Sequence, residues 1–159
     1  MSRFAENTNV SPDRTEAEIR SVLRRYGATQ YVSGWDLSAA MIGFTKGNRT
    51  VRFVLDMPSK NDKSFTRTPT GRIRRNPNSV DEVYEQALRQ RWRALLLVIK
   101  AKLEAVEAGI ATFDEEFSSY IVLPGGQTVG EWLLPQLDAC FQNRSMPALL
   151  PFKKTGTEK

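Results

Sequence analysis

The apolar residues of the chain follow a helical period most clearly over positions 79–108. Within this run they recur at steps of three and four residues, and neither Gly nor Pro interrupts them. Ser79 and Glu82 have the spacing of a capping box, and Gly109 stands where a glycine commonly ends a helix. The pattern predicts a helix of about 30 residues, roughly 45 Å long. A helix of this length needs other elements packed against it.

Before this helix, the sequence predicts a shorter helix and three strands. Ser11 and Pro12 are typical of a helix start, and the apolar steps that follow them end at Gly27. Segments rich in residues that favour strands come next, at 29–35, 41–45 and 50–55. A Gly-Asn turn at 46–49 joins the last two strands into a hairpin, whose expected core face comprises Val51, Phe53 and Leu55.

Two further capping boxes predict two short helices after the long one. They pair Thr112 with Glu115 and Thr128 with Glu131. Pro135 is expected to kink or restart the second of these helices. Apolar residues recur there at helical spacing, and the face expected to point inward comprises Val129, Trp132, Leu133, Leu137, Cys140 and Phe141.

Together these elements predict an α+β fold with a single domain over residues 11–145. A small antiparallel sheet of about three strands is covered by the long helix, with shorter helices at both ends. Residues 1–10 and 146–159 are expected to be flexible tails. The sequence has no apolar run long enough to span a membrane and no signal-peptide pattern near its start. We therefore expect a cytoplasmic protein without a membrane partner.

Composition limits the chemistry that the chain can perform. It contains no His and only one Cys, so catalysis and metal binding that depend on these residues lack their groups. Neither of the common Gly-rich nucleotide-binding patterns occurs. Asp56 with Lys60 resembles half of a Mg²⁺-dependent nuclease site, but a second carboxylate is missing. We predict no enzyme activity, no catalytic residues, no metal ion and no cofactor.

Positive charge is concentrated in one segment. The whole chain has a net charge of +5, and residues 57–78 alone hold six cations against one Asp. This segment contains three prolines and no apolar period, which is typical of functional or disordered loops. By contrast, residues 104–138 carry seven carboxylates and no Lys or Arg. The chain therefore divides into a basic part and an acidic part.

The basic segment predicts contacts with phosphate groups, because Arg forms paired hydrogen bonds with phosphate and a loop can follow a polyanion backbone. We therefore predict non-catalytic binding of nucleic acid, DNA rather than RNA, either single-stranded or duplex. Exposed Phe65, Trp35 or Tyr31 would stack on unpaired bases. The predicted contact residues are Lys60, Lys63, Arg67, Arg72, Arg74 and Arg75, with Arg89 and Arg93 of the long helix as a second line.

The same charges allow other functions. The basic segment could bind an acidic protein surface, or the acidic part a basic channel, so that the chain inhibits a host protein complex. Surfaces of opposite sign could also join copies of the chain into a homo-oligomeric assembly. A Mg²⁺-dependent nuclease is a further alternative, and it would depend on Asp56.

Three segments resemble a family of small, uncharacterised proteins encoded by tailed bacteriophages and prophages. The first is residues 89–132, which begin RQRWRALLLVIKAKLEAVEAG and end GEW. The other two are RRYGATQY at 24–31 and VRFVLDMP at 51–58. The resemblance covers most of residues 15–135 and includes no catalytic motif. It implies a bacterial host cytoplasm. It also implies either the handling of DNA during replication or recombination, or the inhibition of host defence through a host complex.

Overall fold

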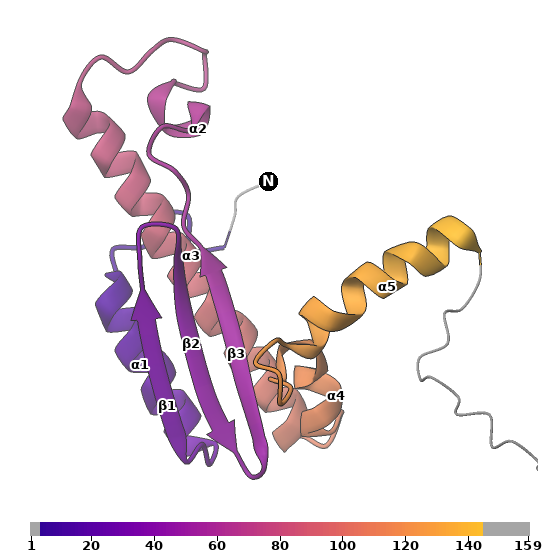
Figure 1. The fold of residues 1–159 in the computed structure, drawn as a ribbon. Coiled ribbons are helices and arrows are strands. Elements are labelled where there is room, and N and C mark those ends of the chain that lie inside the picture. The colour runs from indigo at the N-terminus through magenta and orange to yellow at the C-terminus, as the bar shows by residue number, and fades with distance from the viewer. Residues whose placement is uncertain (1–3, 145–159) are drawn as a thin grey trace, which may run out of the picture.

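The fold is the predicted α+β arrangement of one small sheet and one long helix (Figure 1). The computed structural model describes residues 4–144. Its helices are α1 (Pro12–Arg25), α2 (Lys63–Thr66), α3 (Pro77–Glu107), α4 (Phe113–Phe117) and α5 (Val129–Asn143), with a 3₁₀ turn η1 (Ser118–Tyr120). Its strands are β1 (Gln30–Trp35), β2 (Ala39–Lys46) and β3 (Arg49–Asp56).

The strands form an antiparallel sheet in the order β1-β2-β3. Gly47 lies in the two-residue turn of the predicted hairpin with a φ of +59°, which glycine adopts without strain. Val51 and Phe53 of β3 point into the core as predicted. Val54, the next residue after Phe53, points to the other face of the sheet and is exposed. α1 and α3 pack together on the core face, and no helix within residues 4–144 covers the other face (Figure 1).

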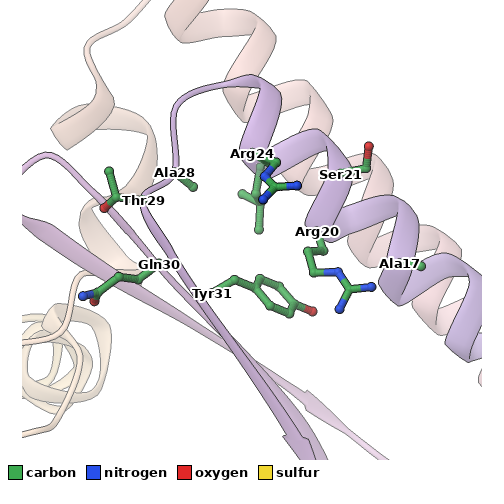
Figure 2. Close-up of a pocket in the computed structure, with 9 residues that line it drawn as sticks. Ala17, Arg20, Ser21, Arg24, Ala28, Thr29, Gln30 and Tyr31 are labelled. Carbon is green, nitrogen blue, oxygen red and sulfur yellow. The ribbon is translucent and has the colours of Figure 1, made fainter.

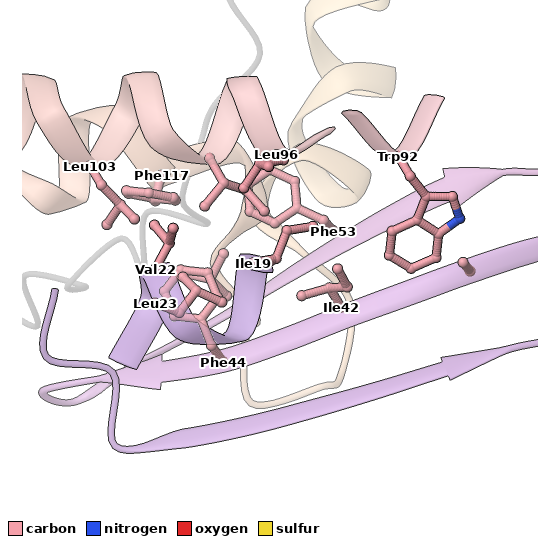
Figure 3. Close-up of a cluster of buried hydrophobic side chains, with 13 residues drawn as sticks. Ile19, Val22, Leu23, Ile42, Phe44, Phe53, Trp92, Leu96, Leu103 and Phe117 are labelled. Atoms are coloured by element: carbon pink, nitrogen blue, oxygen red, sulfur yellow. The ribbon is translucent and has the colours of Figure 1, made fainter. Parts of the chain in front are cut away.

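The core joins α1, the sheet, α3 and α4 (Figure 3). Phe117 of α4 is fully buried and stacks on Phe113, with ring centroids 4.5 Å apart. Its ring also meets Phe44 and Phe53 of the sheet edge-on, at centroid distances of 5.8 and 6.3 Å. The predicted apolar stripe of α3 is confirmed, because its buried residues are Trp92, Leu96, Ile99 and Leu103.

The long helix begins three residues earlier than the predicted cap implies. Its N-cap is Asn76, whose Oδ1 accepts a hydrogen bond from the Asn78 backbone N–H at 3.0 Å, and Pro77 is its first residue. The capping box predicted at Ser79 is wrong, because Asn followed by Pro already starts the helix. The predicted end is confirmed: Gly109 follows the helix with a φ of +70°.

Residues 57–78 are more ordered than a structureless loop. They form α2, whose Phe65 is only 7% exposed and packs edge-on against Tyr84 of α3 at a centroid distance of 5.6 Å. A β-bridge also pairs Arg67 with Ile73. The prediction of an exposed Phe65 is therefore wrong. A single large apolar residue in a polar segment acts here as the anchor of that segment.

The N-terminal residues, which we expected to be flexible, contact α3 where they are described. Gln86 Nε2 donates to the carbonyls of Glu6 and Thr8 at 2.8 and 3.1 Å, and Gln90 Nε2 donates to the carbonyl of Phe4 at 3.1 Å. This segment therefore lies along α3 beside Gln86 and Gln90, in the first half of the helix. The predicted C-terminal tail, 146–159, lies outside the described residues.

α5 begins at the predicted capping box of Thr128 and Glu131 and continues through Pro135 as one helix. Its predicted inward face, however, is only partly covered by the described part of the chain. Val129, Leu133 and Cys140 are half-buried, and the other three members are exposed. Trp132 is 40% exposed and Phe141 81% exposed, and α5 projects from the body beyond its first turn (Figure 1). An apolar period identifies the face of a helix that avoids water, but it does not say which surface will cover that face.

Candidate nucleic-acid interface

The segment between β3 and α3 forms a lobe around the start of α3, beyond the end of the sheet (Figure 1). We call residues 57–76 the basic lobe. Phe65 anchors its first half on α3, and a tight turn shapes its second half. In that turn the Gly71 N–H donates to the Thr68 carbonyl at 2.8 Å, and the Thr68 N–H donates to the Arg72 carbonyl at 2.8 Å. The lobe therefore presents its cations from a hydrogen-bonded frame.

Five predicted contact residues of the lobe form no ion pair within residues 4–144. Four of them are exposed, whereas Arg74 is half-buried and its Nε finds no hydrogen-bond acceptor there. A guanidinium without an internal carboxylate keeps its donors available for an external anion. The five residues are Lys63, Arg67, Arg72, Arg74 and Arg75.

Two other predicted contact residues are paired with carboxylates of α3. Lys60 Nζ lies 2.8 Å from Asp81 Oδ1, and Arg89 Nη1 lies 3.6 Å from Glu85 Oε2. The hydrogen bond to Asp81 raises the pKa of Lys60. These neighbouring carboxylates offset the charge of both cations. Lys60 and Arg89 therefore contribute less to the positive electrostatic field of the lobe than the five residues that form no ion pair.

Arg93 is directed toward α1 rather than toward the lobe. Its Nη1 lies 2.5 Å from Glu18 Oε2, and its side chain is 23% exposed. Lys100 Nζ approaches the other oxygen of the same carboxylate at 2.9 Å. The hydrogen bonds from Lys100 and Arg93 lower the pKa of Glu18. The structure therefore places Arg93 in a contact between two helices and not beside the lobe cations.

The acidic part of the chain pairs with the sheet and α3, and not with the basic lobe. Its ion pairs within the described residues are Arg49–Asp114 at 2.8 Å, Arg52–Glu131 at 2.7 Å and Lys102–Glu116 at 3.3 Å. The hydrogen bond from Arg49 lowers the pKa of Asp114. Among the described residues, the cations without an ion pair are therefore concentrated in the lobe and on α1.

An aromatic cavity of about 220 Å³ lies beside the lobe. Trp35, which is 78% exposed, and Tyr84 both line it. Tyr84 also contacts the lobe directly, since Lys60 Nζ lies 5.1 Å from its ring centroid and Phe65 packs on it. The expected exposure of Trp35 is confirmed. The carboxylates of Asp13, Glu16 and Asp36 line the same cavity.

A second cleft, of about 610 Å³, opens between α1 and β1 (Figure 2). Arg20 and Arg24, one turn apart on α1, line it together with Tyr31, and neither Arg forms an ion pair within the described residues. Burial raises the pKa of the Tyr31 phenol, whose hydroxyl donates to Glu16 Oε1 at 3.5 Å. The two guanidinium groups without an ion pair suit an anion. The four-residue spacing of the arginines was visible in the sequence, but their position against β1 was not.

Two carboxylates at the ends of elements, Glu115 and Asp56, are further candidate chemical groups. Glu115 completes a capping box with Thr112, whose hydrogen bonds lower the pKa of this carboxylate. Asp56 ends β3 as expected, but no group of three or more side chains within residues 4–144 is placed to hold a metal ion. Within the same residues, no helix combines the length and apolar character needed to cross a membrane.

Comparisons of the chain with protein-family models, with curated proteins and with solved structures find no match.

Proposed function

We propose that the protein binds nucleic acid without catalysis, and that the basic lobe is the contact surface. The observation that carries this proposal is which cations form an ion pair with a carboxylate and which do not. Within residues 4–144, cations of the sheet and of α3 are mostly neutralised by nearby carboxylates, whereas five lobe residues form no ion pair. Phosphate contacts release condensed counterions, which makes a cluster of unpaired cations favourable for binding.

The order of the lobe supports this function. A disordered segment loses conformational entropy when it binds, which weakens its affinity. In the lobe, the packing of Phe65 and the backbone bonds of the turn at Gly71 have already fixed much of the chain. The exposed Arg72 and Arg75 extend from this frame. We therefore expect most of the binding energy to be available for phosphate contacts.

Trp35 favours single-stranded ligands over duplex ones. Its ring is 78% exposed and lies across a small cavity from Tyr84, which touches the lobe. An unpaired base can stack on such a ring, and a paired base cannot. The adjacent carboxylates disfavour phosphates inside the cavity, so we assign the phosphates to the lobe and a base to Trp35.

Fluorescence anisotropy with labelled oligonucleotides tests the proposal through two matched double variants. Arg72→Ala with Arg75→Ala removes two charges from the lobe. Arg25→Ala with Arg144→Ala removes two exposed charges elsewhere and is the control. At 0.15 M salt the lobe variant should bind about 10- to 30-fold more weakly than wild type, and the control should change much less. Equal losses, or no binding by wild type, would refute the proposal.

A further inference from the structure

The back of α3, the side opposite its buried residues, is an apolar surface that no other part of residues 4–144 covers. A helix at a protein surface normally places charged residues on that side. Here Leu97 is 44% exposed and Val98 40% exposed, and their neighbours along the same side are small. We call this surface the α3 back, and it comprises Ala94, Leu97, Val98, Ala101, Ala105 and Ala108.

α5 is a second apolar surface left uncovered by the described part of the chain, and its side chains are large. Leu134 is 60% exposed, Leu137 39% and Phe141 81%, in addition to the exposed Trp132. α5 has only two carboxylates, and one of them, Glu131, pairs with Arg52 at the first turn. The helix packs on η1 at its start and makes no extended contact with α3 of its own chain.

We propose that a second copy of this chain covers both surfaces, with α5 of each copy lying along the α3 back of the other. Large side chains on one helix fit between small ones on a facing helix, because the backbones can approach closely there. The same chain supplies both partners of the contact, so two reciprocal contacts close a symmetric dimer. The proposal does not depend on nucleic-acid binding.

The area of these surfaces is sufficient for a stable dimer. Leu134, Leu137 and Phe141 share one side of α5 by helical spacing, and Trp132 lies on another side. The exposed parts of these three side chains, with the matching part of the α3 back, would bury on the order of 1,200 Å² over two reciprocal contacts. Specific interfaces begin at about 1,200 Å². The contact surface of α5 also has few charges to desolvate, since its second carboxylate, Asp138, lies at the edge of that surface, toward Gln142.

Light scattering on size-separated protein gives the first test. Wild type should be a dimer at about 50 µM, since standard interfaces commonly give Kd values of micromolar or below. Ala101→Glu on the α3 back and Leu137→Glu on α5 should each be monomeric with unchanged circular dichroism. Gln142→Glu places the same charge on the polar side of α5 and should remain a dimer. A monomeric wild type, or a dimer that survives both interface variants, would overturn the proposal.

The single cysteine of the chain, Cys140 on α5, allows a second test that does not depend on loss of binding. Cysteine is introduced into the α3 back as Ala94→Cys, Ala101→Cys or Ala108→Cys, and disulfides are formed by mild oxidation. At least one variant should give a cross-linked dimer that disappears when Cys140→Ser is added. Cross-linking of wild type would instead indicate α5 against α5. Cross-linking that survives Cys140→Ser would indicate two α3 backs in contact, and either result overturns the proposed arrangement.

Discussion

Phe117 should contribute more to stability than any other residue of α4. Its ring is fully buried and fills the space between two sheet phenylalanines and Phe113. Phe117→Ala removes all three ring contacts and leaves a cavity that the sheet cannot close, because Phe44 and Phe53 lie on neighbouring hydrogen-bonded strands. Substitutions of this kind cost about 3–5 kcal/mol. For a domain with a stability of about 5–15 kcal/mol, this is a large share.

Urea unfolding followed by circular dichroism measures this loss. With a slope of about 2 kcal/mol per molar urea, the unfolding midpoint of Phe117→Ala should fall by about 2 M. Phe4→Ala is the matched control, because the Phe4 ring is 53% exposed and its carbonyl contact to Gln90 is kept. It should change stability by less than about 0.5 kcal/mol. A loss below about 1 kcal/mol for Phe117→Ala would show that α4 is not packed on the sheet in this way.

Two further predictions concern the contacts of α1 and α5. Glu18→Gln should lower stability at pH 7 by about 1 kcal/mol, a small effect because the carboxylate is partly solvated. Since the pKa of Glu18 is lowered in the folded state from 4.5, the difference from wild type should vanish as the pH falls well below that value, and a pH-independent difference would contradict this reasoning. Gly130→Ala would place a Cβ 2.8 Å from the Ser119 carbonyl oxygen, so amide exchange of α5 should accelerate while that of α3 is retained. Unchanged exchange in α5 would mean that its first turn can shift to make room.

Most of the fold was predictable because local patterns and the final packing agree. The apolar stripe of α3 and the turn at Gly47 specify their elements through residues a few positions apart. The caps at Thr112 and Thr128 are equally local. The start of α3 was misplaced because two cap patterns overlap there, and Asn76 with Pro77 prevails over Ser79.

Features that depend on distant partners were not predictable from the sequence. The burial of Phe65 depends on Tyr84, and the pairing of Arg93 depends on Glu18 on another helix. The exposure of α5 was not predictable for the same reason. Its apolar period indicates which face avoids water, but it does not indicate which surface packs against that face. For the candidate site, the basic segment could be identified from the sequence. Only the structure distinguishes the cations that form an ion pair from those that form none within the described residues.

The dependence of binding on salt tests the central claim most directly. We would measure the affinity for a single-stranded oligonucleotide from 50 to 400 mM salt, for wild type and for Arg72→Ala with Arg75→Ala. Each phosphate contact contributes about 0.7 to the slope of log affinity against log salt for single strands. The lobe variant should therefore have a slope about 1.4 units shallower than wild type. Equal slopes for the two proteins would contradict the account, because the lobe would then make no phosphate contacts.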